Sequence, residues 1–158
     1  MTMNAAIERR LAELSPYSTR GLEWVRLEGG DAFDYPIDYW VAVMGTDIDT
    51  HRADFLVRWE PERYCHFHRH VGRTTVAVLA GEHHVVEEHP HETVHKTRQP
   101  GHVADNPPGD LHMEYGGAKG SLLFFSMQSD DGTLFEFLDR EGGLLRLVTV
   151  EDLATANI

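Results

Sequence analysis

Short hydrophobic runs recur along most of this chain, separated by small groups of glycine, proline and acidic residues. The runs are rich in Val, Leu, Thr and aromatic residues, a pattern that is typical of β-strands bounded by turns. The predicted strands span residues 22–27, 38–44, 53–59, 74–80, 121–127, 133–138 and 144–150. The uninterrupted apolar run at 122–125 predicts a strand buried on both faces, as in a sandwich or a closed barrel. Asp131-Gly132 and Gly142-Gly143 separate neighbouring runs and predict hairpin turns.

A helical period occurs only near the N-terminus. Residues 3–14 place apolar side chains at i, i+4 and i+7, which predicts a short amphipathic helix. The stretch 82–100 is less regular and predicts one or two exposed strands with a loop. No repeat, linker or change of composition divides the chain. We therefore predict a helix and lead-in over residues 1–20 and one all-β domain over residues 21–158.

Composition and charge exclude several classes of partner. The 158 residues include 26 acidic and 14 basic side chains, a formal net charge of −12, which repels nucleic acids and anionic membranes. No apolar run approaches the roughly 18 to 20 residues of a membrane span, and the first residues lack the pattern of a secretory signal. The single cysteine, Cys65, excludes an internal disulfide and is expected to be buried or at a rim. These features predict a cytoplasmic protein without nucleic-acid or membrane partners.

Histidine is the one residue type in clear excess, with eleven in the chain. His66, His68 and His70 alternate, and residues at i and i+2 of a strand point to the same face, so two consecutive members could form half of a metal site. The alternative is a polar strand with solvated histidines. A further group could form a second metal site, but its mixed spacing favours an exposed segment instead; its members are His83, His84, His89, His91 and His95.

Two longer patterns resemble the motifs of the cupin superfamily. The segment 68–81 has the HxH pair and the closing glycine of the first cupin motif, and the segment 101–116 has the Gly, Pro-x-Gly and His of the second. The resemblance implies a single cupin (RmlC-like) jelly-roll β-barrel with a short N-terminal helix. It also implies that His68, His70 and His112 bind one divalent metal ion.

The resemblance also points to the residues around the metal. Cupins usually supply a glutamate from the position that Thr74 or Thr75 occupies here, so the resemblance implies a three-histidine site without a carboxylate. His66 shares the face of the predicted ligands and is a candidate neighbour. Arg58 alternates with apolar residues on its strand and could be an inward anion clamp. No catalytic residue is assigned, and His66 and Tyr64 are the candidates for taking a proton.

Three-histidine cupin sites occur in the iron-dependent dioxygenases that cleave β-diketones and 2,4'-dihydroxyacetophenone, and residues 134–143 resemble the latter branch. The resemblance implies Fe²⁺ for activity, with Zn²⁺ or Ni²⁺ possible in the isolated protein. It implies a small diketone or hydroxyketone and O₂ as substrates, and a homodimer or higher homo-oligomer.

One alternative is a non-catalytic zinc-binding cupin of the anti-sigma-factor type, a sensor or binding module. Zinc-based hydrolase or isomerase chemistry is another.

Overall fold

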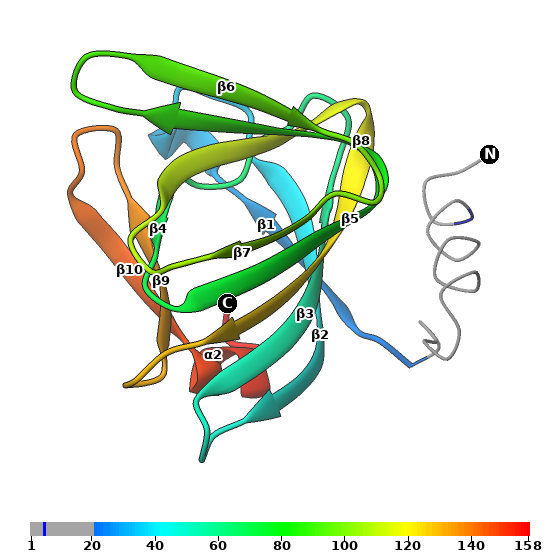
Figure 1. Cartoon of the computed structure of the whole chain (residues 1–158), viewed down its shortest axis with the longest axis vertical. Coiled ribbons are helices and arrows are strands. Elements are labelled where there is room, and N and C mark those ends of the chain that lie inside the picture. The colour runs from blue at the N-terminus through cyan, green and yellow to red at the C-terminus, as the bar shows by residue number, and fades with distance from the viewer. Residues whose placement is uncertain (1–4, 6–20) are drawn as a thin grey trace.

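The computed structural model describes Ala5 and residues 21–158, so the predicted N-terminal helix, apart from Ala5, lies outside the described residues. The described chain consists mainly of antiparallel strands that curl into a barrel (Figure 1). The strands are β1 (Trp24–Glu28), β2 (Asp38–Asp47), β3 (Arg52–Trp59), β4 (His68–His70), β5 (Arg73–Glu88), β6 (Thr93–Arg98), β7 (Val103–Asn106), β8 (Leu111–Gln128), β9 (Thr133–Leu138) and β10 (Leu144–Thr149). A 3₁₀ turn, η1 (Gly30–Ala32), and a short helix, α2 (Val150–Ala154), complete the described elements.

Each of the predicted strands is present, and the stretch 82–100 contains the end of β5 and the whole of β6. The turn at 142–143 joins the antiparallel pair β9 and β10, as expected for a hairpin. The hairpin predicted at 131–132 is wrong, because β9 pairs with β4 and β10 and not with β8. The chain crosses there to another part of the sheet, which a local turn signal does not reveal.

The sheet order is β1-β2-β3-β8-β4-β9-β10, with β5 paired to β6, β7 and β8. β8 is the longest strand, and its two ends pair with different strands. Its second half pairs with β3 through the core, whereas its first residues pair with β4, placing His112 opposite His68. This pairing brings the two predicted metal-binding segments together.

The core lies inside the barrel, where alternate residues of β3, β5 and β8 meet. Phe55 and Phe125 stack at 5.4 Å between ring centroids, and Trp59 packs beside them. The opposite face of the same strands is also apolar, since Leu56 and Leu122 are buried in a second cluster. The prediction of a strand buried on both faces at 122–125 is therefore confirmed.

A bulge in β5 changes which residues face inward. The pairing of β5 with β8 shifts register between Val78 and Ala80 and again between Gly81 and His83. Gly81 has a φ of 75°, and a Cβ there would lie 2.1 Å from the carbonyl oxygen of Gly120, so only glycine fits this crossing. Buried positions are even-numbered before the bulge and odd-numbered after it.

Within the described residues, no helix is long and apolar enough to cross a membrane.

Candidate metal centre

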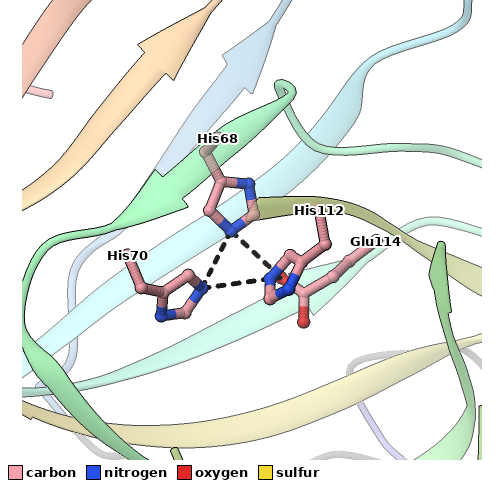
Figure 2. A group of neighbouring side chains, drawn as sticks. All are labelled: His68, His70, His112 and Glu114. Carbon is pink, nitrogen blue, oxygen red and sulfur yellow. Dashed lines mark hydrogen bonds and ion pairs between the residues drawn. The ribbon is translucent and has the colours of Figure 1, made fainter. Parts of the chain in front are cut away.

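The three histidines named by the sequence converge on one point inside the barrel (Figure 2). His68 and His70 come from β4, and His112 comes from the beginning of β8. The Nε2 atoms of His68 and His70 lie 3.0 Å apart, and those of His70 and His112 lie 3.1 Å apart. All three side chains are buried. The structure thus assembles the predicted ligand set around one point.

Hydrogen bonds on the far side of two rings determine which nitrogen carries the proton. His68 Nδ1–H donates to the carbonyl oxygen of His66 at 2.8 Å. His70 Nδ1–H donates to Thr74 Oγ1 at 2.8 Å, because the Thr74 hydroxyl itself donates to the carbonyl oxygen of Gly72. The Nε2 atoms of His68 and His70 therefore present lone pairs to each other at 3.0 Å, an arrangement that a shared cation would stabilise.

Burial keeps the imidazoles of His68 and His70 neutral. It lowers the pKa of His68 to about 4, with a further contribution from nearby His112, and it holds the pKa of His70 well below its usual value. Neutral imidazole is the form that binds a metal ion. The donor chemistry therefore fits a divalent transition metal.

The expectation of a site without a carboxylate is wrong, because Glu114 completes the group. Its Oε2 lies 3.5 Å from His68 Nε2 and 3.4 Å from His112 Nε2, and the donor atoms of all four residues lie within 4.8 Å of one another. Glu114 stands two positions after His112 on β8, so strand alternation places both side chains on the same face (Figure 2). The same spacing rule that selected His68 and His70 could have selected Glu114.

His83 is buried and supports Glu114 from behind, so its assignment to an exposed segment is also wrong. His83 Nε2–H donates to Glu114 Oε1 at 3.0 Å, and its Nδ1 lies 3.0 Å from Ser121 Oγ. Burial alone would raise the pKa of Glu114, but His112 and His83 outweigh burial and hold that pKa well below its usual value. Glu114 is therefore a buried, ionised carboxylate with one oxygen held by His83.

The two threonines have separate positions. Thr74 is fully buried behind His70 and orients that ring, so its hydroxyl is on the far side from the point where the Nε2 atoms meet. Thr75 is the next residue of the strand and is exposed. Neither threonine takes the place of the cupin glutamate.

A small cavity of about 60 Å³ opens beside the group. His68 and Glu114 lie on its wall. Its aromatic lining consists of Tyr39, Phe55, Trp59, Phe125, Phe135 and Phe137. Of the described residues, no lysine or arginine lines it. The cavity therefore suits a small, largely apolar molecule with its polar end toward the histidines.

His66 lies next to this cavity without joining the metal-binding group. Burial lowers its pKa to about 4, and its Nδ1 is hydrogen-bonded to the Tyr39 hydroxyl at 2.8 Å. Its ring stacks on Phe137 at 4.8 Å. Cys65 is buried, as expected, and its Sγ lies 3.6 Å from His68 Nδ1.

Two other candidates lie away from the site. Arg58 faces the outer side of the sheet, where its guanidinium pairs with Glu60 at 3.0 Å and covers the Trp40 ring at 4.9 Å. It is therefore not an inward anion clamp. Tyr64 packs its ring against Tyr35 and Tyr115 and does not line the cavity.

Comparisons with known proteins identify the fold. No protein-family model matches the sequence, and no curated protein is significantly similar to it. Solved structures are similar, among them an RmlC-like cupin protein from Ralstonia eutropha (14% identity, 87% of this chain and 80% of that chain, TM-score 0.66). An acetylacetone dioxygenase from Acinetobacter johnsonii is 15% identical over 83% of each chain, with a TM-score of 0.64. A cupin 2 conserved barrel domain protein from Rhodopseudomonas palustris is 12% identical over 80% of this chain and 82% of that chain, with a TM-score of 0.61. With its single curled sheet and its buried histidines and glutamate, this chain has the RmlC-like cupin fold.

Proposed function

We propose that this protein is a metal-dependent cupin enzyme, a non-haem iron dioxygenase that cleaves a C–C bond of a small β-diketone or hydroxyketone. The observation that carries the proposal is the opening of a three-histidine, one-glutamate group onto an otherwise apolar, aromatic cavity. His68, His70, His112 and Glu114 would hold the ion. The similarity in fold to an acetylacetone dioxygenase supports the proposal.

Held by these four side chains, a ferrous ion would supply Lewis-acid and redox chemistry for a reaction between a ketone and O₂. The aromatic walls exclude water and leave the hydrocarbon part of the substrate in apolar surroundings. Glu114 is an ionised side chain on the cavity wall, and its Oε2, the oxygen that faces His68 and His112, would be its ligand to the ion. His83 donates a hydrogen bond to Oε1 and so keeps Oε2 turned toward the Nε2 atoms of His68 and His112.

Oxygen uptake tests the proposal. The protein is reconstituted anaerobically with Fe²⁺, its iron content is measured, and O₂ consumption is followed across a panel of β-diketones and α-hydroxyketones. We expect uptake with at least one compound, accompanied by carboxylic acid products. The zinc-loaded protein is the matched control and should be inactive, because Zn²⁺ has no redox chemistry. Retained iron with no uptake across the panel would favour the non-catalytic, zinc-binding alternative.

We also propose that the protein forms a homodimer. β10 ends the sheet order, and Leu144, Leu145 and Leu147 on this strand are all exposed. An apolar edge strand is a surface that pairing with a second copy would cover. Light scattering should give twice the chain mass for the parent protein and the monomer mass for the double variant Leu145→Glu, Leu147→Glu. A parent protein that is monomeric at high concentration would contradict this.

A further inference from the structure

A second group of histidines lies on the outer face of β5 and β6, beside β8, the strand that carries His112 and Glu114. Strand alternation turns His83 and Glu114 inward, and their chain neighbours His84 and Tyr115 outward. His84 on β5 pairs in register with Tyr115 on β8. On its other side, β5 pairs with β6, where Thr97 stands opposite His84 and His95 lies two residues earlier on the same face. Three neighbouring strands thus bring these side chains to one place.

The polar atoms of this outer group are close together. His84 Nδ1 lies 2.9 Å from His95 Nε2. The Tyr115 hydroxyl lies 3.1 Å from His95 Nε2, and Thr97 Oγ1 lies 3.3 Å from His84 Nδ1. The Tyr115 ring stacks flat on the His84 ring, with 4.5 Å between centroids and an interplanar angle of 7°. Stacking and strand pairing hold His84 in place.

A carboxylate orients the His84 ring. Its Nε2–H donates to Glu82 Oε1 at 2.7 Å, and Gln99 Nε2 donates to the other Glu82 oxygen at 3.0 Å. In the neutral ring with this tautomer, His84 Nδ1 carries a lone pair aimed toward His95. Metal-binding histidines in proteins characteristically donate their remote N–H to a carboxylate in this way.

The spacing of the ring nitrogens also matches that of the inner group. The separation of 2.9 Å between His84 and His95 compares with 3.0 Å and 3.1 Å between the inner Nε2 atoms. Two imidazole nitrogens that bind one ion at about 2.1 Å are roughly 3.0 Å apart at right angles, as in square-planar or octahedral Cu²⁺ and Ni²⁺, and roughly 3.4 Å apart at the tetrahedral angle of Zn²⁺. We propose that His84 and His95 bind a second divalent transition-metal ion, of the Zn²⁺, Ni²⁺ or Cu²⁺ class. Tyr115, Thr97 and water are its further oxygen donors.

This second site is independent of the proposed dioxygenase activity. It has two imidazoles and is open to solvent, since His95 is exposed and the side chain of His84 is 13% exposed. It is therefore the weaker of the two sites, filled after the inner group is saturated. The competing possibility is a plain hydrogen bond from His95 Nε2–H to His84 Nδ1, which would bind no metal.

Metal stoichiometry separates the two possibilities. Untagged, metal-free protein is titrated with Zn²⁺ by calorimetry, and bound zinc is counted after equilibrium dialysis. We expect two equivalents for the parent protein and one for His84→Ala and for His95→Ala. His91→Ala is the matched control, an exposed histidine near the same hairpin, and should keep both. His112→Ala should lose the inner equivalent and keep the outer one.

Glu82→Gln tests the orienting carboxylate. It should weaken the second equivalent about 10- to 100-fold and leave the first unchanged. Circular dichroism at each step confirms that the variants are folded. A parent protein that binds one equivalent, or a second equivalent that survives in both His84→Ala and His95→Ala, would overturn the proposal.

Discussion

The inner and outer histidine groups lie on opposite faces of the sheet and have nearly the same spacing of ring nitrogens. The inner ligands come from β4 and β8, whereas the outer histidines come from β5 and β6, next to Tyr115 of β8. They differ in burial and in the number of donors. The inner group has three imidazoles and a carboxylate in a buried pocket, where Thr74 and the carbonyl oxygen of His66 orient two of the rings. The outer group has two imidazoles beside solvent. Because the spacing is nearly the same, we expect burial and the surrounding hydrogen bonds to set the difference in metal affinity.

The largest expected difference between the groups is in metal-linked stability. A ligand present at a thousand times its Kd stabilises a fold by about 4 kcal/mol. For a chain of this size, that gain raises the Tm by about 8 to 16 °C. We expect the parent protein to gain a shift of this order on adding Zn²⁺, and His112→Ala to lose most of it. His95→Ala should retain it. Equal loss in the two variants, measured by thermal unfolding with and without EDTA, would contradict the ranking of the sites.

The inner group should also make the metal-free protein sensitive to acid. The pKa of His68 is about 4 in the folded protein and about 6.5 when unfolded, so the unfolded chain binds more protons between these values. The contribution of His68 to the unfolding free energy is therefore fully present above about pH 6.5. As the pH falls toward 4, this contribution, on the order of 3 kcal/mol, is lost. Glu114, whose pKa is lowered, adds a loss only below about pH 4.5.

Urea unfolding of EDTA-treated protein at pH 7 and pH 5 measures this effect. His68→Gln should show a smaller fall in unfolding free energy between the two pH values than the parent. A parent protein equally stable at both would show that His68 and His70 are not held neutral by burial.

A smaller effect is expected from the support behind Glu114. His83→Leu removes the hydrogen bond to Glu114 Oε1 and should weaken the inner metal about 10- to 100-fold. His83→Gln should recover part of this loss, because an amide N–H can also donate to the carboxylate. His84→Leu, one residue along the strand and facing outward, is the matched control. If His84→Leu weakened the inner equivalent as much as His83→Leu, the two faces would not be separate.

The smallest effect is expected at Thr74. Thr74→Val keeps the shape of the side chain and removes the acceptor of the His70 Nδ1–H bond, so the inner metal should bind about tenfold more weakly. Thr75→Val changes the exposed neighbouring residue and should have no effect. Competition with a chromophoric chelator gives both affinities, and a larger loss at Thr75 would contradict the role given to Thr74.

Local patterns were enough to predict the strands, and to predict that the side chains of His68 and His70 share one face of a strand. Alternation within one strand is a property of neighbouring residues. The resemblance to the cupin motifs added His112, and the structure places it opposite His68. The same alternation rule, applied to His112, also selects Glu114. The cupin motif places its glutamate at the position of Thr74 or Thr75 and gives no signal for a carboxylate on the strand of His112.

Tertiary structure alone decided the rest. His83 faces inward because the bulge at Gly81 reverses the alternation of β5, and that bulge depends on contact with β8, a strand far along the chain. Arg58 faces outward although both faces of β3 are apolar, so its hydrophobic pattern did not reveal which side is the interior. The cavity and the outer His84–His95 pair likewise depend on which strands become neighbours. Sequence alternation determined which residues share a face, and only the pairing of distant strands decided what each face meets.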